Sequence, residues 1–388
     1  MIKQEHFCRN CIIPDGFLGL KLNDEGLCNY CLNPNHKNAN WSKIEIDIDK
    51  KKQMLNDWNQ VIKSLQKADK TRNYDCVLGY SGGKDSTALL DYLVNGLNVR
   101  VVAITIDTGF MTDIAKNNIS DTIKKMELEQ HHLFIQNASK AFTRMYRWLF
   151  LNHTSNTISL TVDLCDKCSD LIHSIVVKEA VKREIPYVFF AYSPDQIKRY
   201  FYEIKKEEVL NQWKPVYLDL APFTENDRNF YIDNKKVSIE KIPRILLPYH
   251  VIEYDEKVIV ENIESKGLIQ KGKADPILTN CHVVKAAAMY DFYRYGGLPY
   301  ALQYAELVRQ APDENSHRLY RKKWLKLYRS IGHSIFNGTF NANGIRRFLK
   351  AIGCSKEEIL ESITQFRNKD PNKKKILENI ELINNKNK

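Results

Sequence analysis

The sequence contains no long apolar run. No stretch of about 18 apolar residues, the length that a membrane-spanning helix requires, occurs among its 388 residues. The first residues also lack the apolar region of a signal peptide, and no internal repeat is evident. These absences predict a cytoplasmic protein without a membrane span. The length of 388 residues predicts two or three domains, and the 43% hydrophobic content supports apolar cores for them.

The net charge of +11 permits nucleic-acid binding without demonstrating it. Many lysines lie in ordinary amphipathic segments and in the tail Lys373–Lys375, and a composition rich in lysine and asparagine can reflect genomic bias alone. Lys198 and Arg199 could bind phosphate or RNA, or could form a solvated helix face. Charge therefore leaves RNA binding as an open question.

A glycine-rich heptapeptide is the most informative segment. Its residues are Ser81, Gly82, Gly83, Lys84, Asp85, Ser86 and Thr87. The apolar run 74–80 before it and the helical pattern 88–93 after it predict a strand, a glycine turn and a helix. Adjacent glycines let backbone N–H groups approach an anion, and Ser86 and Thr87 can cap the helix or bond a phosphate oxygen. The segment predicts a phosphate site for ATP; a glycine hairpin without a ligand is the alternative.

The central part of the chain alternates predicted strands with predicted helices. The strands are expected at 75–79, 99–106, 132–135 and 187–191, and the helices at 84–95, 112–127, 138–150 and 168–183. This alternation predicts an α/β fold, a parallel sheet sandwiched by helices. The heptapeptide and the segments 107–109 and 193–196 all follow predicted strands, so we expect them to converge at one edge of the sheet.

The flanking regions predict four parts in all. We expect a zinc-ribbon module at 1–37, a helical linker at 38–72, an ATPase domain at 73–215 and a mixed, mostly helical region at 216–388. One amphipathic helix is expected within 41–72. The C-terminal helices are expected at 281–295, 299–310, 318–331 and 356–366, whereas the pattern of 197–275 is mixed.

Two Cys-x-x-Cys pairs near the N-terminus predict a structural metal site. They comprise Cys8, Cys11, Cys28 and Cys31, with sixteen residues between the pairs. In a chain without export signals this spacing is typical of a zinc ribbon or knuckle, and four thiolates complete a closed tetrahedral shell around Zn²⁺. Free reduced cysteines are the alternative.

A third pair, Cys165 and Cys168, directly precedes the predicted helix 168–183. This position would place both thiols at a helix N-terminus, where the pKa of a thiol is lowered. Cys281, which follows in sequence at the start of another predicted helix, is the best candidate for a third ligand. The alternatives are a redox or persulfide pair, a second zinc site with His173 or His282, and helix-start cysteines without a role.

The heptapeptide resembles the PP-loop signature Ser-Gly-Gly-x-Asp-Ser of the ATP pyrophosphatases, a family with the HUP-like fold. It differs from the Walker A loop, whose spaced glycines are absent. The resemblance covers about residues 6–200. The N-terminal cysteine module with the PP-loop resembles N-acetyl sugar amidotransferases of surface-polysaccharide biosynthesis, and the addition of Cys165, Cys168 and Cys281 resembles the tRNA thiolation enzymes with a [4Fe–4S] cluster. The segment 191–196 replaces their Gly-His-Asn and resembles PP-loop proteins grouped with phosphoadenosine-phosphosulfate reductases.

The resemblance implies that the chain activates the carbonyl oxygen of an acceptor as an adenylate. Residues 81–87 would hold the pyrophosphate, Lys84 would neutralise the leaving group, and Asp85 would place Mg²⁺. Asp107 would lie near the nucleotide or the acceptor, or would cap the helix that follows it. Sulfur delivered through the cysteine cluster is the preferred nucleophile, and ammonia from a glutaminase partner is the alternative. The acceptor, RNA or a small molecule, stays open, as does binding of the C-terminal helices to RNA, a partner enzyme or a second copy in a homodimer.

Overall fold

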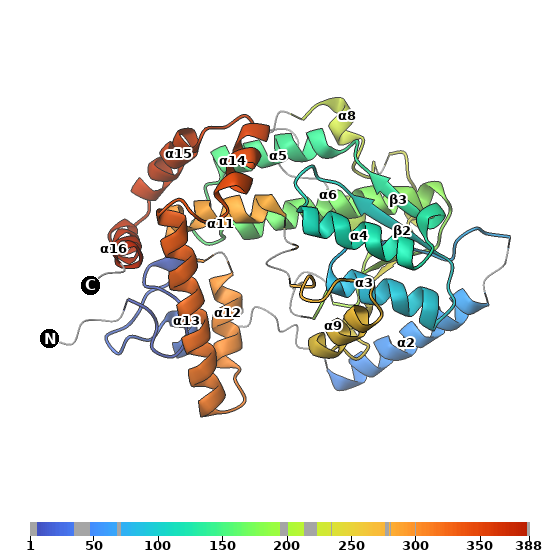
Figure 1. Ribbon diagram of the computed structural model, residues 1–388, viewed down its shortest axis with the longest axis horizontal. Coiled ribbons are helices and arrows are strands. Elements are labelled where there is room, and N and C mark those ends of the chain that lie inside the picture. The colour runs from blue at the N-terminus through green and yellow to red at the C-terminus, as the bar shows by residue number, and fades with distance from the viewer. Residues whose placement is uncertain are drawn as a thin grey trace. The chain divides into compact units, whose positions relative to one another are not determined.

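The computed structural model describes residues 6–34, 47–67, 71–194, 201–212, 223–233, 235–275, 279, 281–298 and 300–385. The chain forms two compact units, each discontinuous in sequence (Figure 1). The first unit comprises 1–42, 145–166 and 282–388, and the second comprises 43–144 and 167–281. The cysteine module therefore groups with the C-terminal helices, and the helix α6, which spans Leu160–Lys182, contributes residues to both units.

The second unit is built on a six-stranded sheet in the order β3-β2-β1-β4-β6-β5. Its strands are β1 (Cys76–Gly79), β2 (Val101–Ile106), β3 (His132–Ile135), β4 (Tyr187–Phe190), β5 (Glu203–Ile204) and β6 (Arg244–Leu246). All neighbours pair in parallel except β5 and β6, which are antiparallel. The four predicted strands and the parallel sheet are confirmed. The two further strands are two and three residues long, too short for a periodic pattern to reveal them.

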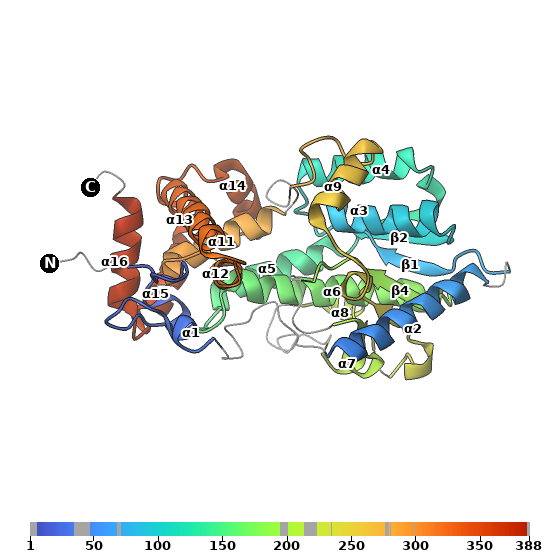
Figure 2. The same ribbon diagram turned by 90° about the horizontal axis from the view of Figure 1, so that it is seen from below.

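Helices cover both faces of this sheet (Figure 2). Besides parts of α5 (Ser139–Asn152) and α6, the described helices of the second unit are α2 (Ile48–Gln66), α3 (Lys84–Asp91), the π-helix η2 (Tyr92–Gly96), α4 (Asp113–Lys125), η3 (Glu129–His131), α7 (Lys206–Gln212), α8 (Glu225–Arg228), η5 (Ile239–Lys241), η6 (Pro248–His250) and α9 (Glu256–Ser265). Leu78, Ala103 and Phe189 share one face and pack with α2, α3 and α4 in one core. Phe190 lies on the opposite face, where the ring of His173 from α6 packs 4.3 Å from it.

The first unit is helical around the buried helix α11. Its helices are α1 (Asn29–Leu32), most of α5 (Ser139–Asn152), the start of α6, α11 (His282–Tyr295), α12 (Ala301–Arg309), α13 (Glu314–Phe336), α14 (Ala342–Ala351), α15 (Lys356–Asn368) and α16 (Lys373–Asn384), with the short η1 (Phe17–Gly19). The helix α11 buries ten of its fourteen residues, because α13, α14, α15 and α16 surround it. The four predicted C-terminal helices are confirmed, whereas α14 and α16 were missed.

No described helix is both long enough and apolar enough to span a bilayer. The helices α2, α6 and α13 have the length, at 19, 23 and 23 residues, but all three carry several charged side chains. Their apolar side chains are used in packing within the fold.

Candidate functional site

The glycine-rich segment forms the turn between β1 and α3, as predicted. Gly82 has a φ of +72°, and a Cβ on it would lie 2.4 Å from Ile119 Cγ1 and 2.9 Å from the carbonyl oxygen of Ala115. Both atoms belong to α4, so the turn packs tightly against this helix. Gly83 has an ordinary φ of −80°, and a Cβ there would meet only Ser81 Oγ at 3.4 Å. Gly82 is therefore the position that sterically requires glycine.

The N-terminus of α3 offers unpaired amides to an anion. Its N-cap is Gly83, which has no side chain to accept from the first turn. Within the described residues, the amides of Lys84, Asp85 and Ser86 have no acceptor, and Thr87 N donates to Gly83 O. The prediction that Ser86 or Thr87 caps the helix is wrong, because both lie inside it. Three converging N–H groups and the positive end of α3 suit a phosphate group.

The hydroxyl groups of the turn fix its shape. Ser81 Oγ lies 3.1 Å from Ser86 Oγ, which donates to Gly83 O at 3.1 Å. Gly83 N in turn donates to Ser81 Oγ at 3.4 Å, and Thr87 Oγ1 lies 3.3 Å from the hydroxyl of Tyr80. These contacts hold the turn in place before any ligand arrives.

Lys84 and Asp85 form a buried polar cluster with a distant tyrosine. Lys84 Nζ lies 2.7 Å from Asp85 Oδ2, 3.3 Å from the Tyr254 hydroxyl and 3.4 Å from Glu256 Oε1. The Tyr254 hydroxyl donates to Asp85 Oδ1 at 2.9 Å. Burial, and then the charge of Asp85, raise the pKa of Tyr254 well above its usual value, so the phenol stays protonated as a donor. The cluster leaves Glu256, which is 62% exposed, as the most accessible partner of Lys84.

The topology of the sheet places this turn at a switch point. From β1 the chain continues to β2 and β3 on one side, and then returns to β4 on the other side of β1. Loops after β1 and β4 diverge there, which is where open α/β sheets bind ligands. His250 Nε2 lies 3.4 Å from Ser193 O, after β4, and the neighbouring Tyr249 donates to the carbonyl oxygen of Asp85, after β1, at 3.1 Å. The loops after β1 and β4 thus meet as predicted, while Asp195, Gln196, Lys198 and Arg199 lie outside the described residues.

Asp107 follows β2 at the same edge of the sheet. Its Oδ1 accepts from Gly109 N at 2.8 Å, and its Oδ2 lies 3.7 Å from Lys116 Nζ. The alternative role as the cap of the next helix is wrong, because Thr112 caps α4 by accepting from Ala115 N. Asp107 shapes the loop beside the glycine turn, and a role in the chemistry stays a prediction.

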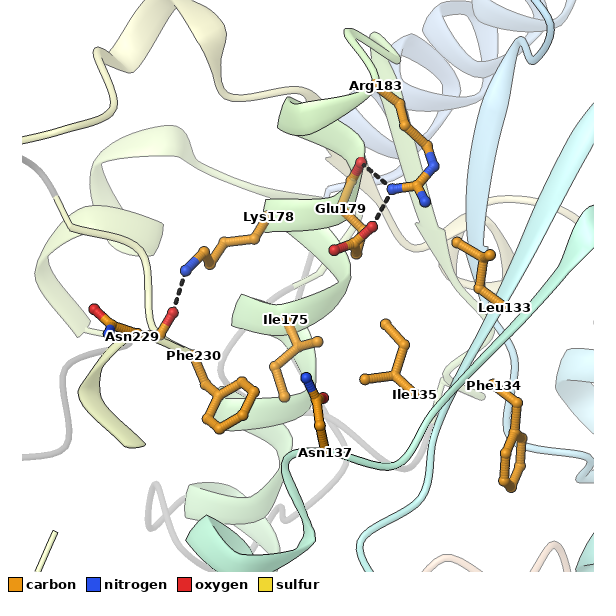
Figure 3. Close-up of a pocket in the computed structure, with 10 residues that line it drawn as sticks. All are labelled: Leu133, Phe134, Ile135, Asn137, Ile175, Lys178, Glu179, Arg183, Asn229 and Phe230. Carbon is orange, nitrogen blue, oxygen red and sulfur yellow. Dashed lines mark hydrogen bonds and ion pairs between the residues drawn. The ribbon is translucent and has the colours of Figure 1, made fainter. Parts of the chain in front are cut away.

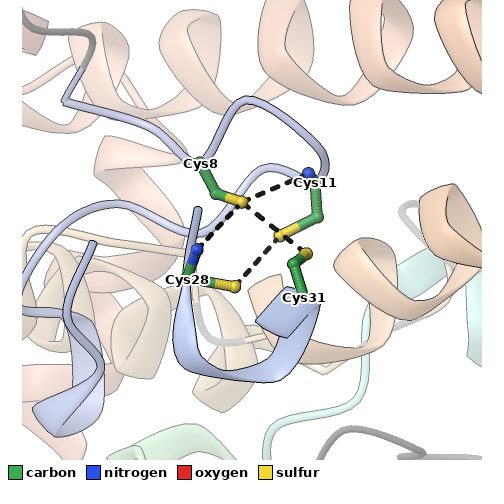
Figure 4. A group of neighbouring side chains, drawn as sticks. All are labelled: Cys8, Cys11, Cys28 and Cys31. Atoms are coloured by element: carbon green, nitrogen blue, oxygen red, sulfur yellow. Dashed lines mark hydrogen bonds between the residues drawn. The ribbon is translucent and has the colours of Figure 1, made fainter. Parts of the chain in front are cut away.

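The four N-terminal cysteines come together in one cluster (Figure 4). Their sulfur atoms all lie within 4.8 Å of one another, and Cys8, Cys11 and Cys28 are fully buried. Backbone amides of Cys11 and Cys28 donate to Cys8 Sγ, at 3.5 and 3.3 Å. Hydrogen bonds within the cluster lower the pKa of the Cys8 thiol and lower that of Cys31 to about 7. Four sulfur donors at this spacing suit a tetrahedral metal ion.

The cysteine cluster is held against the C-terminal helices. Arg321, on α13, donates to the carbonyl oxygens of Cys8 and Cys11 at 2.8 and 2.9 Å. His317, one turn earlier, lies 2.7 Å from Asn10 O. The metal-ligand loop and α13 therefore form one structural element within the first unit.

The second cysteine pair lies inside a helix, which corrects the sequence prediction. The helix α6 begins at Leu160, so Cys165 and Cys168 lie beyond its first turn. Its leading amides, of Leu160 and Thr161, donate to the carboxylate of Asp291 at 2.8 and 3.1 Å. Neither thiol therefore lies at the helix N-terminus, whose field acts within the first turn. This cap from Asp291 explains the earlier start of α6.

Cys165 and Cys168 are half-buried and one turn apart, so they share a face of α6. Cys165 Sγ lies 3.6 Å from the Tyr300 hydroxyl. Cys281 directly precedes α11, as predicted. Cys165 belongs to the first unit, and Cys168 and Cys281 to the second, so the three-cysteine site stays a prediction.

The alternative of a second zinc site has no support in the described residues. Neither unit, taken by itself, contains a further group of three potential metal ligands whose atoms lie within 4.8 Å of one another. His173 instead bonds through Nε2 to the Tyr192 hydroxyl at 2.8 Å and packs on Phe190. These contacts fit a structural role for His173.

Comparison with known proteins adds little to this geometry. No family model matches the sequence, and no curated protein matches it. One solved structure that is similar is the U34-tRNA thiolase NcsA from Methanococcus maripaludis with its [4Fe–4S] cluster. The identity is 14%, the match covers 84% of this chain and 89% of that chain, and the TM-score is 0.31. A similarity at this level carries no argument on fold or function, so the proposals below rest on the residues of this chain.

A cavity of about 360 Å³ lies beside the edge strand β3 and α6 (Figure 3). Its charged side chains already have partners in the protein, because Lys178 donates to Asn229 O and Arg183 pairs with Glu179. The rest of its lining is mainly apolar, from Leu133, Ile135, Ile175 and Phe230. It contains none of the residues of the glycine turn, so it is not the predicted phosphate site.

Sequence reasoning missed the tyrosine that organises the glycine turn. Tyr254 lies 169 residues after Asp85, in a region without a clear period. Tyr249, from the same segment, donates to the carbonyl oxygen of Asp85 at 3.1 Å. Nothing local in the sequence marks either residue, because only the folding of the segment before α9 over α3 brings them there.

Proposed function

We propose that this protein is a PP-loop enzyme that uses ATP to activate an oxygen atom of its acceptor. The observation that carries the proposal is the turn after β1, with three unpaired amides at the start of α3, at the switch point of a parallel sheet. Lys84, the first residue of α3, supports the proposal because it adds a positive charge beside these amides. Residues 81–87 would hold the pyrophosphate, and Asp85 would place Mg²⁺ directly or through water.

The reaction is an adenylation followed by a substitution. The carbonyl oxygen of the acceptor attacks the α-phosphorus of ATP, and pyrophosphate leaves. A nucleophile then adds to the activated carbon, and AMP departs with the former carbonyl oxygen, so no electron donor is needed. AMP is a far better leaving group than hydroxide, and the cation at Lys84 would stabilise the charge on the departing pyrophosphate.

We propose sulfur as the nucleophile. Two cysteines one turn apart on α6, with Cys281 as a third, would hold a [4Fe–4S] cluster. When bound, the cluster would offer an open iron for sulfide. Ammonia from a glutaminase partner remains the second candidate, but nitrogen chemistry gives no reason for these cysteines. We assign zinc to the separate N-terminal cluster, because four thiolates without an open position make a structural site.

Nucleotide chemistry is tested through Lys84 and Asp85. We expect Lys84→Ala and Asp85→Ala to lower ATP–pyrophosphate exchange by about 10²-fold or more, measured with RNA and metabolite fractions as acceptors. Lys52→Ala on α2, an exposed lysine, is the matched control and should exchange like the wild type. If both active-site variants keep full exchange, the nucleotide assignment is wrong.

Metal analysis after anaerobic purification distinguishes sulfur from ammonia as the nucleophile. Iron, acid-labile sulfide and the visible absorption of a cluster are expected in the wild type, and should be lost in Cys168→Ser and Cys281→Ser. Zinc should persist in both variants, because the N-terminal cysteines are untouched. Zinc without iron in the wild type would reject the sulfur assignment in favour of ammonia.

A further inference from the structure

The positive charge of the protein is concentrated in one of its units. The first unit contains 25 lysines and arginines against 16 acidic residues, which gives +9, and the second contains 33 against 31, which gives +2. The chain total of +11 is therefore not a uniform composition bias. The unit without the glycine turn carries most of the charge that would attract a polyanion.

Within the first unit, α13 presents a face of one charge sign. Between residues 318 and 330, its exposed positions contain five basic residues and no acidic one: Arg318, Lys322, Lys323, Lys326 and Arg329. At 100° per residue they occupy one side of the helix, opposite the buried Tyr328 and Ile335. From Arg318 to Arg329 the stripe is about 16 Å long. None of the five forms an ion pair within the described residues, so the charges are unneutralised.

Lys323, at one edge of this basic stripe, contacts a pair of stacked aromatic side chains that lies beyond that edge. Trp324 stacks on Tyr304 of α12, with ring centroids 4.1 Å apart and planes 10° apart, and both side chains are partly exposed. Lys323 Nζ lies 4.9 Å from the centroid of the Trp324 ring, and Tyr320 is 41% exposed on the same helix. Stacked aromatic side chains next to cations are the features that bind unpaired bases and their phosphates.

We propose that the exposed side of α13, with Trp324 and Tyr304, is an RNA-binding surface with an unpaired segment of RNA as its ligand. Arg321 attaches α13 to the N-terminal cysteine cluster, so this surface is held on a rigid support. A membrane surface fits less well, because the apolar side of α13 is buried and only Leu319 and Tyr320 are exposed large hydrophobics on it. The RNA is the acceptor of the adenylation if the proposed function holds; the binding itself does not depend on it.

The test measures binding of a fluorescein-labelled RNA hairpin with an unpaired loop, without ATP, over a range of salt concentrations. We expect Lys322→Glu/Lys326→Glu/Arg329→Glu to weaken binding by about tenfold or more and to lower the salt slope by about 2 to 3. The control Lys50→Glu/Lys51→Glu/Lys52→Glu changes the net charge equally on α2 of the other unit and should stay within about twofold of the wild type. If charge reversal disturbs folding, Lys322→Gln/Lys326→Gln/Arg329→Gln serves in its place. It removes the same charges without adding acidic groups and should also weaken binding.

A second pair of variants tests the aromatic side chains. Trp324→Leu, which keeps an apolar side chain, should weaken RNA binding about fivefold or more but leave binding of inorganic polyphosphate unchanged, and Trp324→Phe should bind RNA normally. Wild-type affinity in the α13 triple variant, an equal loss in the α2 control, or binding to phosphatidylserine vesicles without binding to RNA would each overturn the proposal. A protein that binds RNA but shows no ATP–pyrophosphate exchange would refute the proposed function and leave this surface standing.

Discussion

The two units of this protein are stabilised in different ways and carry different charges. The second unit is nearly neutral and packs helices on a mostly parallel sheet, so its core is apolar. The first unit carries +9, and its N-terminal segment has few regular elements and four cysteines in place of a large core. The difference indicates a division of labour, in which the neutral unit would activate with ATP and the basic unit would hold a polyanionic partner.

Removing the metal from the N-terminal cysteine cluster should have the largest effect of these changes, and it acts on the first unit. Cys11→Ser removes a fully buried ligand, and binding free energies at structural zinc sites reach about 10 to 16 kcal/mol, more than a typical domain's total stability. We expect loss of bound zinc and a much lower melting temperature for the first unit, by metal analysis and calorimetry. Cys31→His, at the least buried ligand, keeps a four-ligand shell and should retain zinc. Equal stability with and without zinc would contradict the structural role.

Two neighbouring glycines test how the second unit is stabilised at the turn between β1 and α3. Gly82→Ala adds a Cβ at positive φ against α4, so we expect a loss of about 2 to 4 kcal/mol in the free energy of unfolding. Gly83→Ala adds the same atom at φ −80°, where only Ser81 Oγ lies within 4 Å of it, and should change this free energy by less than about 1 kcal/mol. Urea titration measures both. Similar losses in the two variants would show that the turn is not packed as described.

The buried carboxyl of Asp291 gives the first unit its own pH dependence. Burial raises the pKa of Asp291 from 3.8 to about 6, although the amides of Leu160 and Thr161 and the charge of His153 oppose the shift. Between pH 3.8 and about pH 6 the folded state therefore binds more protons than the unfolded state. The Asp291 carboxyl thus stabilises the fold at low pH, and this stabilisation is lost as the pH rises through about 6.

The loss should reach about 3 kcal/mol at most. Asp291→Asn keeps one acceptor oxygen for the helix cap and removes the titration. The difference in unfolding free energy between wild type and variant, measured by urea titration at several pH values, should therefore change between pH 4 and pH 7. Parallel pH curves for the two proteins would contradict the assignment.

The smallest expected effect concerns the exposed acid beside Lys84. Glu256→Gln removes a negative charge 3.4 Å from Lys84 Nζ, so the ammonium group becomes more available to a phosphate. Because Glu256 is well exposed, solvent screens this pair, and we expect ATP to bind only a few-fold more tightly in calorimetric titration. Glu261→Gln, on the solvent side of the same helix, is the control. Weaker binding in Glu256→Gln would mean that this carboxylate helps to place Mg²⁺.

The sequence predicted local features well wherever the pattern was continuous. The strands of the sheet, the turn 81–83 and the Cys8–Cys31 cluster follow from short segments with apolar runs, adjacent glycines or fixed cysteine spacing. It failed at Cys165 and Cys168, because the start of α6 is fixed by Asp291, which lies 126 residues after Cys165. Local patterns do not reveal a helix cap that is supplied from so far away.

The sequence by itself determined the glycine turn after β1, the parallel order of its neighbouring strands and the four-sulfur cluster, since each depends on residues close together along the chain. Only the tertiary structure decided that Tyr254 holds Lys84 and Asp85, and that Arg321 ties the cysteine cluster to α13. It also decided that five basic residues of α13 lie on one exposed face, where none forms an ion pair with another described residue. These are consequences of long-range packing, which buries one side of each helix and thereby selects the side chains that remain available to a ligand.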